Sequence, residues 1–104
     1  MTKIVSLLCV VGCLAAFAVP ALAAGPTVRV GDDYFKAKTI RIKRGTTVTW
    51  RWVGSSTHDV VFRRFKSKLK ERGTYRHKFR RAGTYRYVCT LHDDEGMKGK
   101  VIVR

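Results

Sequence analysis

Apolar and polar residues alternate along several short stretches of this chain. The clearest stretch runs from Thr46 to Trp52 and places Val48, Trp50 and Trp52 on one face. Alternation of this kind, in a stretch rich in β-branched and aromatic residues, is typical of a strand with one buried face. Similar stretches, separated by turns, occupy residues 27–30, 39–43, 59–62, 74–80, 84–89 and 100–104. The pattern predicts an all-β domain, either a sandwich or a barrel.

One segment departs from this pattern. Residues 63–72 form the most basic run of the sequence, and Phe62, Phe65 and Leu69 have a roughly helical spacing. A turn or two of amphipathic helix would satisfy that spacing. We instead expect an irregular, solvated connection with Phe65 and Leu69 turned inward and its cations forming a docking surface.

The first residues predict export. A nearly unbroken apolar run follows Lys3, and the small residues that end at Ala23 form a signal-peptidase site. We therefore expect a signal peptide over residues 1–23, cleaved after Ala23, and a single mature domain over residues 24–104 in the periplasm or outside the cell. A retained membrane anchor fits less well because the run is short. Lipidation at Cys13 ranks lower still, since the apolar run continues past it.

The charge of the chain is strongly positive. The full sequence has 22 basic and 7 acidic residues, a net charge of +15. Only Lys3 falls in the leader, so the mature chain keeps 22 − 1 = 21 basic residues and a net charge of +14. Such an excess predicts an anionic partner. Export argues against nucleic acid, which leaves a partner protein with an acidic docking face or an anionic membrane surface.

The cysteines and histidines suggest a metal site. Cys9 and Cys13 leave with the predicted leader, so Cys89 remains as a lone thiol that burial or a metal bond would protect. Cys89, His92 and Met97 share one short loop, and their thiol, imidazole and thioether suit copper. A second imidazole ligand could come from His58, which precedes a predicted strand, or from His77, which lies within a predicted strand. We favour His58, because His77 lies among aromatic residues and is expected to pack there.

These residues also carry a resemblance. The pattern Cys89-x-x-His92-x-x-x-x-Met97, after Gly-Thr-Tyr-x-Tyr and before Lys-Gly-Lys-Val-Ile-Val, resembles the ligand loop of the plastocyanin and pseudoazurin branch of the cupredoxins. The segment that begins with His58, 31 residues before the cysteine, resembles the one carrying their first histidine. The likeness spans nearly all of the mature chain.

The resemblance implies a fold and a function. It implies a small Greek-key β-sandwich of about seven to eight short strands that binds one copper ion and shuttles between Cu(I) and Cu(II). His58, Cys89 and His92 would be the trigonal ligands and Met97 the axial one. The protein would be a monomeric, soluble one-electron carrier that meets redox partner proteins, with His92 as the point of electron exit.

The sequence departs from the family in three places. Asp59 stands where relatives often have asparagine, and Val88 stands where plastocyanins have a surface aromatic residue. Asp93, Asp94 and Glu95 place three acids next to His92. Our hypothesis is that these acids stabilise Cu(II) and lower the reduction potential, so that neutral amides at all three positions should raise it.

The sequence also bears on three functions other than electron transfer: catalysis, copper delivery or storage, and a structural role. No nucleophile–base constellation or acid pair is present, so no enzyme activity is expected. Copper delivery or storage would use the same four ligands and is the main alternative. A structural or adhesive sandwich that binds anionic polymer is a third, and it predicts that Cys89→Ser leaves function intact.

Overall fold

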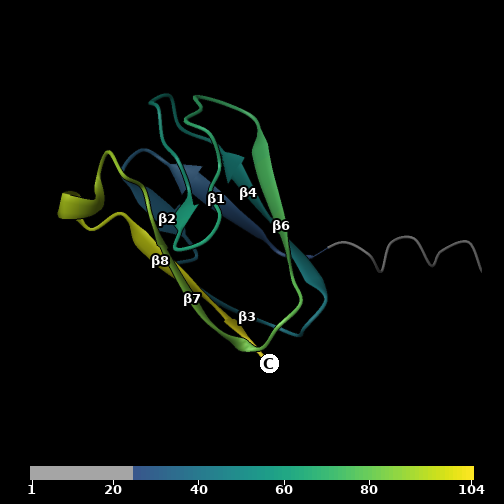
Figure 1. Cartoon of the computed structure of the whole chain (residues 1–104). Coiled ribbons are helices and arrows are strands. Elements are labelled where there is room, and N and C mark those ends of the chain that lie inside the picture. Colours follow the sequence, from purple (N-terminus) through teal and green to yellow (C-terminus); the bar gives the residue numbers. More distant parts are fainter. Residues whose placement is uncertain (1–24) are drawn as a thin grey trace, which may run out of the picture.

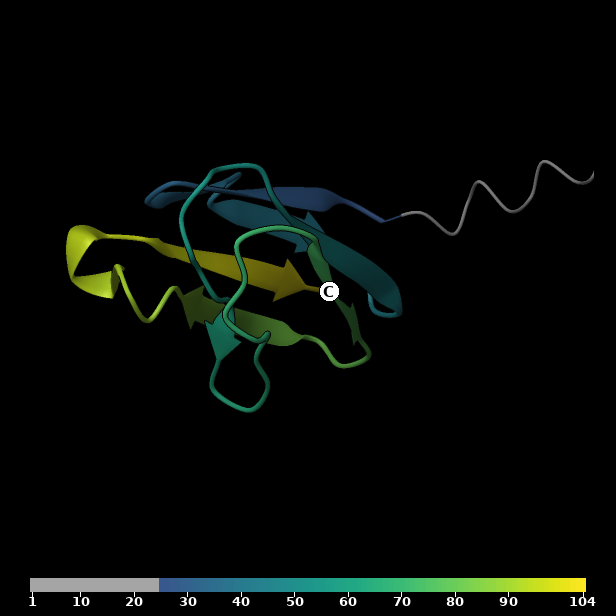
Figure 2. The same ribbon diagram turned by 90° about the horizontal axis from the view of Figure 1, so that it is seen from above.

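The computed structural model describes residues 25–104, which form eight strands in two four-stranded sheets (Figure 1). The first sheet has the order β2 (Tyr34–Lys36), β1 (Thr27–Gly31), β4 (Thr46–Trp52), β6 (Thr74–Phe79). The second has the order β3 (Thr39–Ile42), β8 (Lys98–Val103), β7 (Gly83–Val88), β5 (Val61–Phe62). Figure 2 shows them as two layers. The predicted all-β sandwich is confirmed, and the barrel is not formed.

The predicted signal peptide and the candidate lipidation site lie outside the described residues. Within residues 25–104, no helix has the length and apolarity that a membrane crossing requires. The only named helical element in this part of the chain is the 3-10 turn η2 (Asp93–Glu95).

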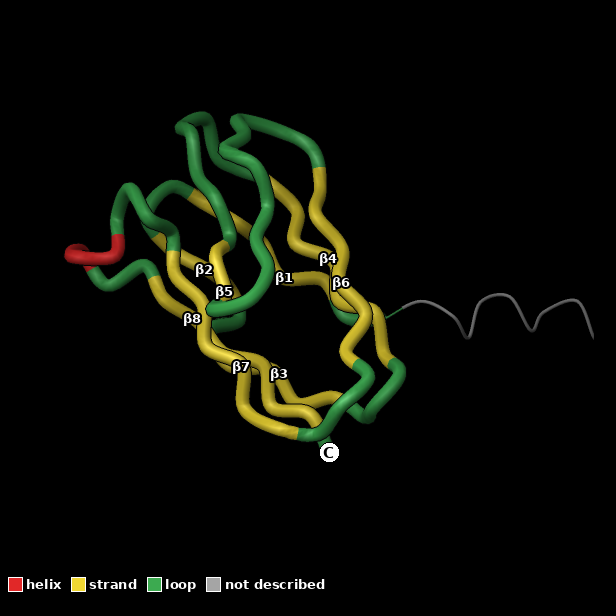
Figure 3. The backbone as a smooth tube through the Cα atoms, viewed as in Figure 1, coloured by secondary structure: helices red, strands yellow, loops and turns green. Residues whose placement is uncertain are grey.

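The strand directions bring several loops to one end of the sandwich. β1 pairs in parallel with β4, and β3 in parallel with β8, while the other pairs are antiparallel. The β1–β2 turn and the connections β4–β5, β5–β6 and β7–β8 therefore gather at one end (Figure 3). Hydrogen bonds from Ser55 and Ser56 to Asp32, and from Thr90 to Asp59, join these loops. We call this end the loop end.

The core lies between the layers and is built around Trp50. This residue is fully buried, and its ring meets Phe62 and Tyr87 edge-on at centroid distances of 5.5 Å. Val48 and Trp52, on the same face of β4, are also buried, so the alternation in this strand is confirmed. Aromatic contacts of this kind add to the stability that apolar burial provides.

His77 takes part in packing, as predicted. Its ring stacks on Phe65 with the centroids 3.6 Å apart and the planes 8° apart. Burial, with a smaller effect from Arg80, lowers the pKa of His77 below its usual value. Phe65 is half-buried and packs against the core, so its predicted inward position is confirmed. His77 lies outside the cluster formed by the other two histidines.

The side chains of Leu69 and Tyr34 are exposed. Leu69 is 56% exposed, so its predicted inward position is wrong. Residues 65–70 are extended, and Ser67 turns inward in place of Leu69. The backbone N–H of Ser67 donates to Val60 O, and the Ser67 hydroxyl accepts a hydrogen bond from Val60 N. Tyr34 is also exposed, because β2 turns Phe35 into the core and its neighbour outward.

Candidate metal centre

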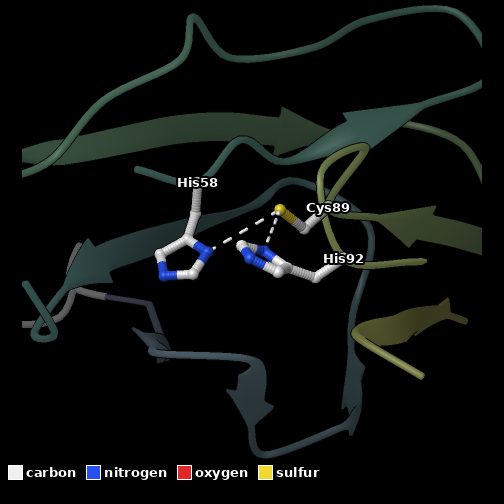
Figure 4. A group of neighbouring side chains, drawn as sticks. All are labelled: His58, Cys89 and His92. Atoms are coloured by element: carbon white, nitrogen blue, oxygen red, sulfur yellow. Dashed lines mark hydrogen bonds between the residues drawn. The ribbon is translucent and has the colours of Figure 1, made fainter. Parts of the chain in front are cut away.

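Three side chains predicted as ligands converge at the loop end. His58 Nδ1 lies 3.7 Å from Cys89 Sγ, and His92 Nδ1 lies 3.5 Å from the same sulfur (Figure 4). The two imidazole rings are 5.0 Å apart between centroids. His58 and Cys89 are fully buried, whereas the side chain of His92 is 22% exposed. The arrangement is a buried pocket of donors with one imidazole at the surface.

The backbone around His58 is held on both sides. His58 N donates to Lys70 O, and Lys70 N donates back to His58 O, so the basic 65–70 segment runs antiparallel beside the histidine and is joined to it by an isolated β-bridge. The indole N–H of Trp52 also donates to His58 O. Because these are buried backbone bonds, the imidazole starts from a fixed point in the core.

The loop that carries Cys89 closes on itself before β8 begins. His92 N donates to Cys89 O, Met97 N to His92 O, and Cys89 N to Met97 O. Gly96 adopts φ 84°, a left-handed conformation that favours glycine and lets the chain turn back after η2. Met97 is fully buried beside this turn. The loop therefore brings the backbone of the fourth predicted ligand against that of the cysteine.

Asp59 ties the two ligand-bearing segments together. Its carboxylate accepts hydrogen bonds from Thr90 N at 2.7 Å and from Thr90 Oγ1 at 2.6 Å. Asp59 follows His58 and Thr90 follows Cys89, so this link fixes the histidine loop relative to the cysteine. Two short bonds to one largely buried carboxylate are of the strong, charge-assisted kind.

Two further carboxylates face the outer edges of the imidazoles. Asp32 Oδ1 accepts a hydrogen bond from His58 Nε2 at 3.0 Å, and Asp33 Oδ1 lies 3.3 Å from His92 Nε2. The bond to His58, followed by those from Ser56 and Ser55, holds the pKa of Asp32 well below its usual range. A proton on Nε2 leaves each Nδ1 lone pair directed at the centre, which is how histidines that bind metals are usually oriented.

Sequence reasoning missed these two residues. Asp32 and Asp33 follow Gly31, and because Asp is common in turns the local sequence indicates only a turn there. The turn is real, and Asp33 has a φ of 71° within it. The contacts between this turn and the histidines join residues that are 26 or more positions apart in the sequence. A local sequence pattern cannot predict such contacts.

The three acids after His92 form the exposed turn η2. Carboxylate oxygens of Asp33 and Glu95 lie within 4.8 Å of each other and of a ring nitrogen of His92. This exposed group shares His92 with the buried centre, so we treat it as the rim of that centre. The effect of the η2 acids on the reduction potential stays a hypothesis.

The donors present fit copper. One thiolate and two imidazole Nδ1 atoms within 4.8 Å of one another, beside a buried thioether residue, form the mixed soft and intermediate donor set of a mononuclear copper site. A sandwich with such a centre at its loop end defines a small copper protein of the cupredoxin class.

Comparison with known proteins identifies the family. The model of the copper-binding proteins of the plastocyanin/azurin family matches residues 26–104, and the chain belongs to this family. Amicyanin-alpha of Methylorubrum extorquens is 37% identical over 89 residues, covering 77% of this chain and 73% of the relative. Plastocyanin of Scenedesmus fuscus is 33% identical over 96 residues, covering 75% and 98%. The family is that of copper proteins, and copper is the cofactor.

Solved structures agree with the fold. The structure of a reduced mutant of amicyanin superimposes with a TM-score of 0.71 at 28% identity, covering 78% of this chain and 83% of that one. A purple cupredoxin from Nitrosopumilus maritimus shares the fold with a TM-score of 0.69 at 22% identity, covering 76% and 99%. The resemblance to the cupredoxins noted in the sequence is thereby confirmed.

Proposed function

We propose that this protein is an exported one-electron carrier with a mononuclear type 1 copper site. His58, Cys89 and His92 would hold the ion as trigonal ligands, with Met97 as a weak axial ligand. Copper bound to such a set supplies a reversible one-electron couple whose potential depends on the axial ligand and on the surroundings of the sulfur. The proposal includes the removal of residues 1–23 and the absence of catalysis.

One observation carries the choice of electron transfer over copper delivery. His58 and Cys89 are buried, and the segments that carry the donors are held by bonds that do not depend on the metal: Asp32 to His58, Asp59 to Thr90, and the loop bonds of Cys89. A donor set fixed in advance changes little when the charge of the ion changes, which favours fast electron transfer. Delivery requires ligands that move aside for an acceptor, and only His92 is accessible among the three converging donors.

The first test is spectroscopic. Cu(II) is added to the copper-free mature protein, and visible and electron paramagnetic resonance spectra are recorded. We expect an intense blue colour and the narrow copper hyperfine splitting of a thiolate-bound type 1 centre. A colourless product would overturn the assignment of Cys89 as a ligand.

The second test separates carrier from delivery protein. Voltammetry should show a reversible one-electron couple with copper retained over repeated cycles. In parallel, the Cu(I) protein is mixed with a soluble copper-acceptor domain. Rapid transfer of Cu(I) to the acceptor, together with poor electrochemical reversibility, would support delivery instead.

The redox partner is proposed from charge and position. His92 is the donor side chain that reaches the surface, so we infer that electrons pass there. The acidic docking face expected of the partner stays a prediction, because Asp33 and the η2 acids lie next to His92 and would repel such a face. The salt dependence of the electron-transfer rate would test it: attraction makes the rate fall with salt, and repulsion makes it rise.

A further inference from the structure

The outer face of the β2-β1-β4-β6 sheet is a surface of cations and hydroxyls. Alternation sends Val28 and Val30 of β1 into the core, and their neighbours outward. The outward residues of the four strands include five cations and four threonines: Lys36, Arg29, Arg51, Arg76, Lys78, Thr27, Thr47, Thr49 and Thr74. We call these nine residues the cationic face.

The cations of this face form a row across the sheet. Lys36 of β2 lies opposite Arg29 of β1, and Arg29 lies opposite Arg51 of β4. Arg76 of β6 lies opposite Thr49 and so is diagonal to Arg51. Adjacent strands are about 4.8 Å apart, and like charges placed opposite each other destabilise a sheet.

No acid in the sheet offsets this repulsion. In residues 25–104, the carboxylates that form ion pairs within 4.0 Å do so with histidines, and no lysine or arginine takes part. A small domain has little stability to spare, so an uncompensated row of cations points to an anion from outside the molecule.

The middle of the face is hollowed. A hollow of about 310 Å³ is lined by Arg51 and Arg76, by the four threonines of the face and by Gly25. Guanidinium groups donate in a fork that matches phosphate oxygens, and hydroxyls can donate to the same group. The donors available therefore suit a phosphodiester.

We propose that the cationic face binds an anionic membrane surface through its phosphodiester headgroups. Exposed lysines and arginines each contribute to binding at an anionic membrane surface, and they do so without an apolar anchor. A protein partner would need an apolar centre in its interface. In the strands of this sheet, Tyr34 is the one large hydrophobic residue with an exposed side chain, so the face offers little apolar area to such a partner.

The proposed orientation leaves the metal centre free. Figure 2 shows the β1–β4 layer on one side of the sandwich and η2 projecting from the end. A membrane lying against the cationic face would leave His92 open to a partner that diffuses along the same surface. An acidic redox protein bound on this face would instead be separated from Cys89 by the first sheet.

The test is binding to vesicles. Mature protein, with and without copper, is mixed with vesicles of phosphatidylcholine alone or mixed with phosphatidylglycerol, and the bound fraction is measured by sedimentation at low and high salt. We expect binding to the anionic vesicles only, weakened by salt and independent of copper. Because copper is not needed, failure of the electron-carrier proposal would leave this result unchanged.

A matched pair of triple variants locates the surface. The first combines Arg29→Gln, Arg51→Gln and Arg76→Gln, which should weaken binding about 100-fold if each cation contributes as at other membrane surfaces. The control removes three cations from the outer face of the other sheet: Arg41→Gln, Arg86→Gln and Lys100→Gln. The control should retain most of the binding.

Thermal unfolding and, with copper, the blue spectrum verify that both variants fold. Equal loss of binding in the two variants would assign the effect to total charge and overturn the proposal, as would a lack of binding to anionic vesicles. A soluble acidic polypeptide that binds this face and displaces the vesicles at equal charge concentration would assign it to an acidic protein instead.

Discussion

The acids and the cations of this protein occupy different regions and are used differently. All seven acidic residues belong to the loop end: Asp32, Asp33, Asp59, Glu71, Asp93, Asp94 and Glu95. Four of them contact named partners there, with Asp32 and Asp33 at the two histidines, Asp59 at Thr90 and Glu71 at Thr57. The cations of the cationic face have no carboxylate partner in the described part of the chain.

This contrast shows that the two kinds of charge have different tasks. A carboxylate that accepts directed hydrogen bonds orients a loop or a ligand, and its loss leaves buried donors unpaired. A cation without a partner inside the molecule contributes to the field outside it. The net charge of +15 combines both kinds of charge and does not show that they are used differently.

The largest effect is expected from Cys89→Ser. The substitution removes the thiolate and should abolish the intense blue absorption and the narrow hyperfine splitting completely. The copper-free fold should persist, because serine is smaller than cysteine. Vesicle binding by the cationic face should not change. A variant that remains blue would refute the ligand assignment, and loss of vesicle binding would show that the two regions are coupled.

The next effect is on stability. Asp59→Ala removes both bonds to Thr90 from a largely buried position, and we expect the free energy of unfolding to fall by about 2–3 kcal/mol. Urea unfolding of the copper-free protein measures this change in the free energy of unfolding. Asp59→Asn is the control: its side-chain oxygen can still accept from Thr90 N, so the loss should be smaller. Equal losses would mean that the charge, not the geometry, provides the stability.

The sequence predicted the parts of this molecule that depend on local patterns. Alternation located strands such as β4, and the spacing of His58, Cys89 and His92 located three residues that the structure brings together. These features depend on the period of a strand or on a short loop, and both are visible within a few residues.

Other parts depended on contacts between distant segments. The spacing of Phe62, Phe65 and Leu69 was ambiguous, and the outcome was decided when residues 65–70 paired with residues 58–62. Asp32 meets His58 because β1 and β4 run in parallel and end at the same edge of the sheet. Asp33 meets His92 because the β7–β8 connection of the other sheet lies at the same end of the sandwich. The row of cations likewise appears only when strand register is known.

A smaller effect concerns the reduction potential. Asp33→Asn removes a negative charge 3.3 Å from His92 Nε2, which should destabilise Cu(II) relative to Cu(I). Asp33 is 58% exposed, so solvent screens it, and we expect a rise of up to about 60 mV, a tenfold change for one electron. Asp94→Asn is the control with the same change in charge. Voltammetry should give a clearly larger shift for Asp33; equal shifts would favour the general effect of acids near His92.

The smallest effect is expected from Arg51→Gln. The change relieves repulsion with Arg29, so the free energy of unfolding at low salt should rise by about 0.3–0.5 kcal/mol. Arg41→Gln is the control, because the residue opposite Arg41 on β8 is Ile102. High salt should remove the gain, since the Debye length falls to about 3 Å at 1 M. Urea unfolding measures both variants.

The sign of this effect distinguishes the two regions most directly. Asp59→Ala should destabilise the protein, whereas Arg51→Gln should stabilise it and, at the same time, weaken its binding to anionic vesicles. Opposite changes in folding and binding are what a cation without an internal partner would produce. If Arg51→Gln destabilises the free protein, the arginine takes part in the fold, and the cationic face loses the argument from uncompensated charge.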